Sequence, residues 1–148
     1  MGSSGNLLRI LDGSPPKLSA IITQGVFRSN SASVGGAARL NGNIRLDRVV
    51  FEDNTASGGG TVYTDGGITT IVNSVFQRNS AAVNSAAVWQ VQGVADLSNT
   101  AMSLNLVNGA RKNCLGSIVS LGGNIIDTAL ADDCTGFTQT SDQLGVSH

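Results

Sequence analysis

Acidic side chains gather in one short stretch of the chain, where Asp47 is followed by Glu52 and Asp53. Two carboxylates can act as general acid and base on a glycosidic bond when both face one cleft, roughly 5–10 Å apart. A predicted turn separates Asp47 from Glu52, which argues against a shared cleft. A minimal polysaccharide lyase or glycoside hydrolase site nevertheless stays open as an alternative. The remaining acids are scattered: Asp12, Asp65, Asp96, Asp127, Asp132, Asp133 and Asp142.

A second set of residues combines a cation with two aromatic rings. Arg39, Tyr63 and Trp89 occupy equivalent positions in successive segments of the chain. Flat aromatic surfaces beside a guanidinium suit stacking on a sugar ring, and they also suit a protein interface. Ordinary partial burial is the alternative explanation. We take this row as the candidate ligand-binding surface, for carbohydrate or for a protein.

Other catalytic residue types are scarce. The single histidine, His148, stands at the last position. Hydrolysis by a Ser or Cys nucleophile normally uses an oriented histidine base, so that chemistry is effectively excluded. The two cysteines, Cys114 and Cys134, supply too few ligands for a four-ligand zinc centre. We expect no metal and no cofactor.

Composition and charge exclude two classes of partner. The 148 residues carry 9 Lys and Arg against 10 Asp and Glu, a formal net charge of -1. Such a chain has no electrostatic attraction to nucleic acid. Its apolar runs are far shorter than the roughly 20 residues of a membrane-spanning helix. We therefore expect one ordered domain that binds no nucleic acid and has no membrane span.

Several segments of the chain are repeats of one another, with a period of about 25 residues. Each begins with an aliphatic residue and continues to a Phe-x-x-Asn motif. The fourth copy replaces the Phe by Met and keeps the Asn. The copies run from Ile22 to Ala32, from Leu46 to Ala56, from Ile71 to Ala81 and from Leu97 to Val107.

The repeats predict the fold. Their short runs of Val, Ile and Leu, bounded by Asn, Gly and Ser, fit strands and not helices. A repeat of this length holds about three short strands, and it can pair in parallel with the next repeat at a spacing of about 4.8 Å. Leucine-rich repeats need a leucine consensus that is absent. We predict an all-β, right-handed parallel β-helix of about five to six coils, with three strand rows per coil.

Equivalent residues of successive coils should form rows. The large apolar row should be buried, and the Asn row should hydrogen-bond from coil to coil at a turn. Both are read as structural. The apolar row is Phe27, Phe51, Phe76 and Met102, and the Asn row is Asn30, Asn54, Asn79 and Asn105.

Charges on the same alignment alternate in sign. Arg28 stands over Glu52, and Asp53 stands over Arg78. Cross-strand ion pairing explains this pattern, at about 0.2–1 kcal/mol for each exposed pair. The acids of the repeats are therefore interpreted first as structural, with catalysis or calcium binding as the alternative.

Cys114 and Cys134 are predicted to form a disulfide, which favours an oxidising compartment; two buried free thiols are the alternative. The exposed ends of a parallel solenoid are a liability that must be capped or paired. We therefore expect homo-oligomerisation through coil ends or faces. The predicted organisation is a non-native leader at 1–5, a first coil or cap at 6–20, repeats at 21–112, and a C-terminal coil with a disulfide-closed cap at 113–148.

The Phe-x-x-Asn motifs, together with Gly35-Gly36-Ala37-Ala38, resemble the FxxN and GGA repeats of chlamydial polymorphic outer-membrane proteins and related bacterial β-helix proteins. The stretch from Cys114 to Cys134 resembles the C-terminal part of secreted pectin-lyase-like β-helices. The resemblance covers residues 20–145. It implies the parallel β-helix fold, whereas the calcium ligands and catalytic Arg of pectate lyases have no matching motif.

The expected function is non-enzymatic. We predict a secreted or cell-surface module that binds carbohydrate or protein, or serves a structural role. The enzyme alternative uses Asp47, Glu52 and Asp53 with a nearby Arg. Ice binding is disfavoured because outward threonines do not recur from coil to coil.

Overall fold

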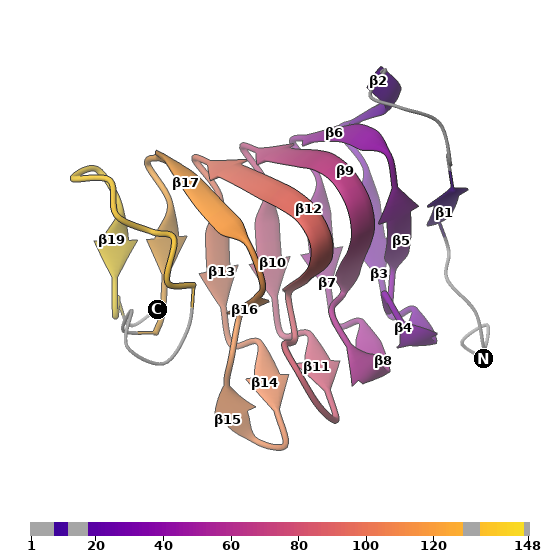
Figure 1. Cartoon of the computed structure of the whole chain (residues 1–148). Coiled ribbons are helices and arrows are strands. Elements are labelled where there is room, and N and C mark those ends of the chain that lie inside the picture. Colours follow the sequence, from indigo (N-terminus) through magenta and orange to yellow (C-terminus); the bar gives the residue numbers. More distant parts are fainter. Residues whose placement is uncertain (1–7, 12–17, 129–133, 147–148) are drawn as a thin grey trace.

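The computed structural model describes residues 8–11, 18–128 and 134–146. No helix occurs among these residues, and parallel sheets stack coil upon coil as a β-solenoid of about four turns (Figure 1). The predicted all-β solenoid is therefore confirmed. The predicted leader, parts of the first coil or cap, and His148 lie outside the described residues.

Two details of the prediction need correction. The number of turns is about four and not five to six, because the ends of the chain contribute incomplete coils. At one end β1 (Leu8–Leu11) pairs only with β5, and at the other β19 (Gln143–Leu144) pairs only with β18. The second correction concerns the strand rows, because one of the three sheets contains two rows per coil.

That two-row sheet is the eight-stranded one. Its rows are separate strands in the first coils and fuse into continuous 11-residue strands in β9 and β12. Gly67 and Gly93 lie inside these strands at positive φ, where a Cβ would collide with backbone of the preceding coil. Besides β1, the sheet comprises β2 (Leu18–Thr23), β5 (Ala38–Asn41), β6 (Asn43–Asp47), β9 (Val62–Val72), β12 (Val88–Ser98), β16 (Cys114–Leu115) and β17 (Ile118–Gly122).

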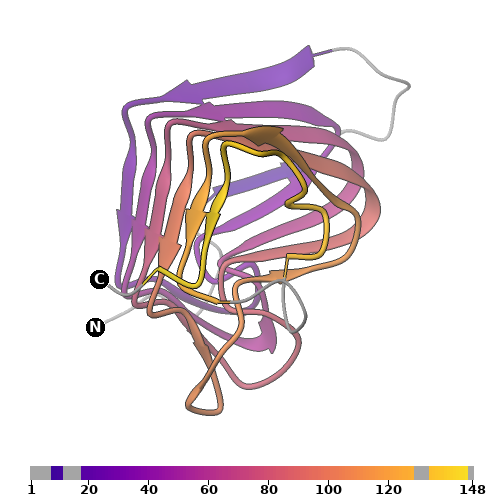
Figure 2. The same ribbon diagram turned by 90° about the vertical axis from the view of Figure 1, so that its left-hand side faces the viewer.

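The other two sheets form the remaining walls, which the end-on view in Figure 2 shows as successive coils behind one another. The six-stranded sheet comprises β3 (Val26–Arg28), β7 (Val50–Glu52), β10 (Val75–Gln77), β13 (Ala101–Ser103), β18 (Ile125–Ile126) and β19. The five-stranded sheet comprises β4 (Ser31–Val34), β8 (Thr55–Gly59), β11 (Ser80–Ala81), β14 (Leu106–Val107) and β15 (Ala110–Arg111). Within it, β14 and β15 pair antiparallel as a hairpin.

The predicted apolar row forms the centre of the core. The ring centroids of Phe27 and Phe51 lie 5.1 Å apart, and those of Phe51 and Phe76 lie 4.7 Å apart. Met102 is in register with Phe76 and is fully buried. Because each strand alternates its side chains between two faces, the residues on either side of each Phe point outward.

The predicted Asn row is a continuous hydrogen-bonded ladder. The Nδ2 of Asn54 donates to the Oδ1 of Asn79 at 3.0 Å, and that of Asn79 donates to Asn105 at 2.9 Å. The same Nδ2 atoms also donate to backbone carbonyls one coil back, such as that of Phe27. The residue before each Asn is left-handed, as at Asp53 and Arg78. The ladder therefore satisfies a tight corner that would otherwise leave buried polar groups unpaired.

The C-terminal end is closed by a covalent link. Cys114 and Cys134 form the predicted disulfide, with their Cα atoms 4.9 Å apart. Phe137 is buried beside it in the same core. A disulfide of this kind persists in a non-reducing environment. Within the described part of the chain, no helix has the length and apolar character needed to span a membrane.

Candidate functional site

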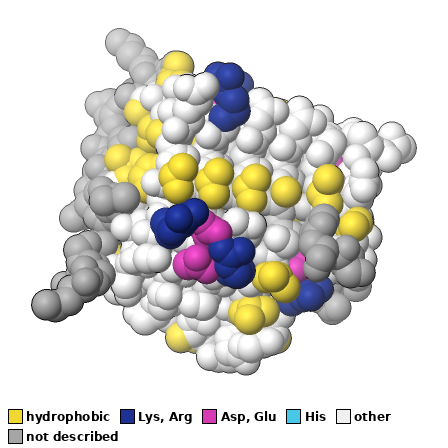
Figure 3. Space-filling view, turned by 180° about the vertical axis from the view of Figure 1, so that it is seen from behind, with side chains coloured by type: hydrophobic (Ala, Val, Ile, Leu, Met, Phe, Trp, Pro, Cys, Tyr) yellow, Lys and Arg dark blue, Asp and Glu magenta, His cyan; other side chains and the backbone are white. Residues whose placement is uncertain are grey.

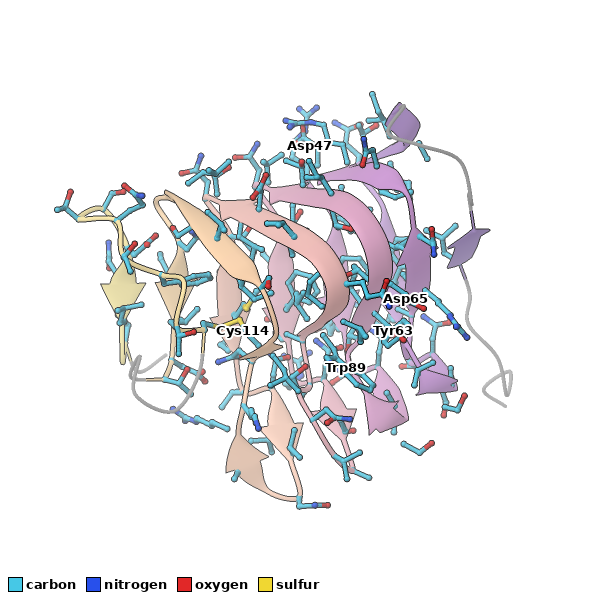
Figure 4. The ribbon with its side chains drawn as sticks, viewed as in Figure 1. Asp47, Tyr63, Asp65, Trp89 and Cys114 are labelled. Carbon is cyan, nitrogen blue, oxygen red and sulfur yellow. A yellow bond between two sulfur atoms is a disulfide. The ribbon has the colours of Figure 1, made fainter. Side chains whose placement is uncertain are left out.

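The candidate binding row lies on the outer side of the eight-stranded sheet. Arg39 on β5 pairs in register with Tyr63 on β9, which pairs with Trp89 on β12. Their neighbours along each strand, such as Ala38 and Leu40, are buried, so the alternation of the strand turns the row outward. The structure thus brings the three predicted residues together as an aromatic row, of which Figure 4 labels Tyr63 and Trp89.

The three side chains of the aromatic row contact one another in sequence. The Arg39 guanidinium carbon lies 5.3 Å from the centroid of the Tyr63 ring, a cation–π contact. The Tyr63 and Trp89 rings meet edge to face, with centroids 5.0 Å apart and planes at 76°. This arrangement leaves the aromatic faces half-buried, and it fixes their orientation before any ligand arrives.

Trp89 is held over a glycine corner that the sequence analysis did not assign to the site. A Cβ built on Gly60 would lie 2.9 Å from the Trp89 Cβ, and one on Gly59 would lie 3.3 Å from the indole ring. Both glycines have positive φ. In the sequence, the run Gly58 to Gly60 indicates a tight corner. The run lies just before β9, the strand that pairs with β12, and only the observed register shows that Trp89 lies over it.

The Arg39 guanidinium has fewer polar partners than the other arginines within residues 18–128. Its Nε is buried and has no hydrogen-bond partner among the described residues. Asp65 lies two residues after Tyr63 on the same face (Figure 4). Burial raises the pKa of Tyr63, the Asp65 carboxylate raises it further, and Arg39 opposes both. The Tyr63 hydroxyl therefore stays protonated at neutral pH and can donate a hydrogen bond.

The acidic candidates lie elsewhere and are engaged by arginines. Glu52 on β7 is only 6% exposed and accepts hydrogen bonds from Arg28 on one side and Arg78 on the other. Gln77 donates a further bond to it at 2.8 Å. Removal from water raises the pKa of Glu52, but the hydrogen bonds and charges of the two arginines outweigh this and lower it overall. The predicted ion pair between Arg78 and Asp53 is present at 3.0 Å.

Asp47 belongs to a different sheet and a different set of partners. It ends β6 and accepts a hydrogen bond from Asn73 at 3.1 Å. Arg45 lies 3.3 Å away and Arg48 3.6 Å away. The Asn73 hydrogen bond is the main influence that lowers the pKa of Asp47, with both arginines contributing. Within the described ranges, no group of three His, Cys, Asp or Glu side chains could hold a metal ion.

Glu52 and Asp53 lie on the six-stranded wall, which faces the viewer in Figure 3. There the pair Arg28–Glu52 and the pair Asp53–Arg78 form one compact patch beside a stripe of aliphatic side chains. The stripe is in register from strand to strand: Val26, Val50, Val75, Ala101 and Ile125. The chemistry of this wall is internal pairing of charges between neighbouring coils.

Two further features escaped the sequence analysis. Two polar side chains link neighbouring coils at the corner before the Phe row: Ser74 accepts from the Val49 amide, and Asn124 accepts from the Thr100 amide. They differ in residue type, so no repeat marked them. The outer side of the five-stranded sheet also has a shallow hollow of about 370 Å³. It is lined by Ser31, Ala32, Ser33, Thr55, Ala56, Ser57 and Ala82.

Comparison with known proteins adds no family. No family model, no curated protein and no solved structure matches the chain. The resemblance to FxxN-repeat and pectin-lyase-like β-helices therefore rests on the repeat motifs and on the solenoid itself.

Proposed function

We propose that the chain is a non-enzymatic, extracellular or cell-surface β-solenoid module that binds carbohydrate through the aromatic row. The observation that carries the proposal is the partly exposed Tyr63–Trp89 pair with Arg39 at its end. Sugar rings present one apolar face that stacks on an aromatic ring, and hydroxyls that need polar partners. Asp65 supplies such a partner on the same face as Tyr63.

The disulfide supports the extracellular part of the proposal, because such bonds are rare in reducing compartments. The resemblance to secreted and outer-membrane β-helices agrees with it. Nothing favours the enzyme alternative to the same degree, since Glu52 and Asp53 are bound by arginines and Asp47 belongs to another sheet.

The test uses the whole chain on a glycan array, followed by titration of the best ligand. Trp89 is the sole tryptophan, so its fluorescence reports directly on the aromatic row. We expect a saturable fluorescence change that is lost in Tyr63→Ala. The control variant Val75→Thr, on the six-stranded sheet, should bind as the parent does.

Two results would contradict the proposal. One is an array without binding and a protein ligand captured instead at the aromatic row. The other is the appearance of unsaturated product from polyuronides, with or without calcium, which would establish the lyase alternative.

A further inference from the structure

The arginines of this protein differ in whether they have an acidic partner. Within residues 18–128 and 134–146, Arg39 has no carboxylate within ion-pair distance. Every other arginine in these ranges has one: Arg28, Arg45, Arg48, Arg78 and Arg111. Arg39 is also the one whose side chain joins the aromatic row. The exception therefore lies in the proposed binding surface.

The surroundings of Arg39 make its isolation costly. Its Nε is buried without a hydrogen-bond partner, and a buried donor left unpaired destabilises the folded state. A guanidinium is a rigid, planar donor that matches the two oxygens of a carboxylate or a sulfate. An oxyanion that reaches the guanidinium from solvent would supply the counter-charge that no residue in the described part of the chain provides.

The register of the other charged wall shows what Arg39 lacks. There, Arg28 on β3 pairs in register with Glu52 on β7, so the cation has an anion one coil away. The residue in register with Arg39 on the next coil is Tyr63, which offers an aromatic ring and no charge at neutral pH.

We infer that the ligand of the aromatic row is an acidic sugar, whose oxyanion binds Arg39 while a ring of the same ligand stacks on the indole of Trp89, which Tyr63 holds in place edge to face. This inference rests on the proposed carbohydrate function. Arg39 and Trp89 are two strand spacings apart, about 10 Å, which suits a ligand of at least two sugar residues. Asp65 repels the oxyanion and so orients it toward the Arg39 end.

The experiment compares three cello-oligosaccharides of equal length: the neutral sugar, its C6-carboxylated form and its C6-sulfated form. Binding is followed by Trp89 fluorescence in the whole chain. We expect at least one acidic form to bind more tightly than the neutral sugar. Arg39→Gln should weaken that binding by about tenfold or more, the range of a hydrogen bond to a charged group. Arg39→Lys should fall between, because it keeps the charge and loses the planar pair of donors.

Arg48→Gln is the matched control, because it removes the same charge from an exposed corner near Asp47. Preference for carboxylate or for sulfate identifies the acidic group, and either result supports the inference. Equal weakening by Arg48→Gln would overturn it, since net charge alone would then explain the binding. Equal binding of all three sugars, unchanged in Arg39→Gln but lost in Tyr63→Ala, would overturn the acidic ligand and keep the carbohydrate function. No fluorescence response to any sugar would overturn both.

Discussion

The six-stranded and the eight-stranded walls both carry rows of in-register side chains that include arginines, and they differ in whether those arginines have acidic partners. On the six-stranded wall, Glu52 lies between Arg28 and Arg78, so each charge has a partner one coil away. On the eight-stranded wall, Arg39 has an aromatic ring where the other wall has a carboxylate. On the six-stranded wall, which we call the closed wall, Arg28, Glu52 and Arg78 pair with one another. On the eight-stranded wall, which we call the open wall, Arg39 has no carboxylate partner among the described residues.

The difference separates charges that hold the coils in register from a charge that is available to a ligand. Exposed ion pairs contribute only about 0.2–1 kcal/mol each, but opposite charges in register disfavour a shifted pairing of the strands. An arginine without a carboxylate has no such role. Four changes, taken from the largest expected effect to the smallest, test whether the two walls differ in this way.

The first change removes part of the core beneath both walls. Phe51→Ala should lower the free energy of unfolding by about 3–5 kcal/mol, because the stacked rings on either side cannot close the cavity. The adjacent Val50 points outward from the same strand, so Val50→Ala should cost about 1 kcal/mol or less. Urea unfolding followed by Trp89 fluorescence measures both. Equal losses would mean that the inward and outward assignments of β7 are wrong.

The second change breaks the corner that supports the closed wall. Asn54→Leu should cost about 1–3 kcal/mol, since the backbone amide and the Nδ2 of Asn30 would lose their acceptor, the Oδ1 of Asn54, and the Phe27 carbonyl would lose a donor. Asp53→Asn is the control, because Asn tolerates the left-handed backbone and loses only the exposed ion pair with Arg78. It should cost less. A melting temperature unchanged by Asn54→Leu would show that the ladder does not contribute to stability.

The repeat determined how much of this could be predicted from the sequence. Phe51 and Asn54 recur with one residue type in neighbouring coils, so their rows were predicted correctly and are confirmed. The disulfide was predicted from the pairing of the sole cysteines and is also confirmed. The continuous strands β9 and β12 were missed, because glycines such as Gly67 and Gly93 were expected to bound short strands. Their positive φ bends a strand without ending it.

For the candidate site, the sequence predicted which residues form the row, and it did not predict which partners surround them. Arg39, Tyr63 and Trp89 were placed in one row by alignment, and the structure agrees. That Arg39 has no carboxylate partner among the described residues depends on side-chain distances that the spacing of the repeats does not reveal. The glycine corner under Trp89 depends on the neighbouring coil, because Gly60 and Trp89 are far apart in sequence. The proposed function of the row stays a prediction.

The third change tests the closed wall by pH. The folded-state pKa of Glu52 is lowered from its ordinary value of 4.5, so its ion pairs stabilise the fold above that value and are lost as the pH falls through the lowered pKa. Glu52→Gln should therefore lower the melting temperature at pH 7, and the gap from the parent should close on acidification below about pH 4. Asp47, whose pKa is also lowered, keeps part of the acid sensitivity in both proteins. Thermal melts at each pH measure the difference in melting temperature between the parent and Glu52→Gln. A difference that stays constant from pH 7 to pH 3 would show that the charge of Glu52 is not what stabilises this wall.

The smallest effect is expected on the open wall, and it decides the comparison most directly. Arg39→Gln should change the free energy of unfolding by no more than about 0.5 kcal/mol, because a lost cation–π contact is offset by relief of the unpartnered Nε. Arg78→Gln removes the same charge but breaks contacts with both Glu52 and Asp53, so it should destabilise more. Parallel urea titrations at low salt measure the difference. If Arg39→Gln proves the more destabilising of the two, then Arg39 contributes to the stability of the fold. The argument that its guanidinium is available to bind an anion then fails.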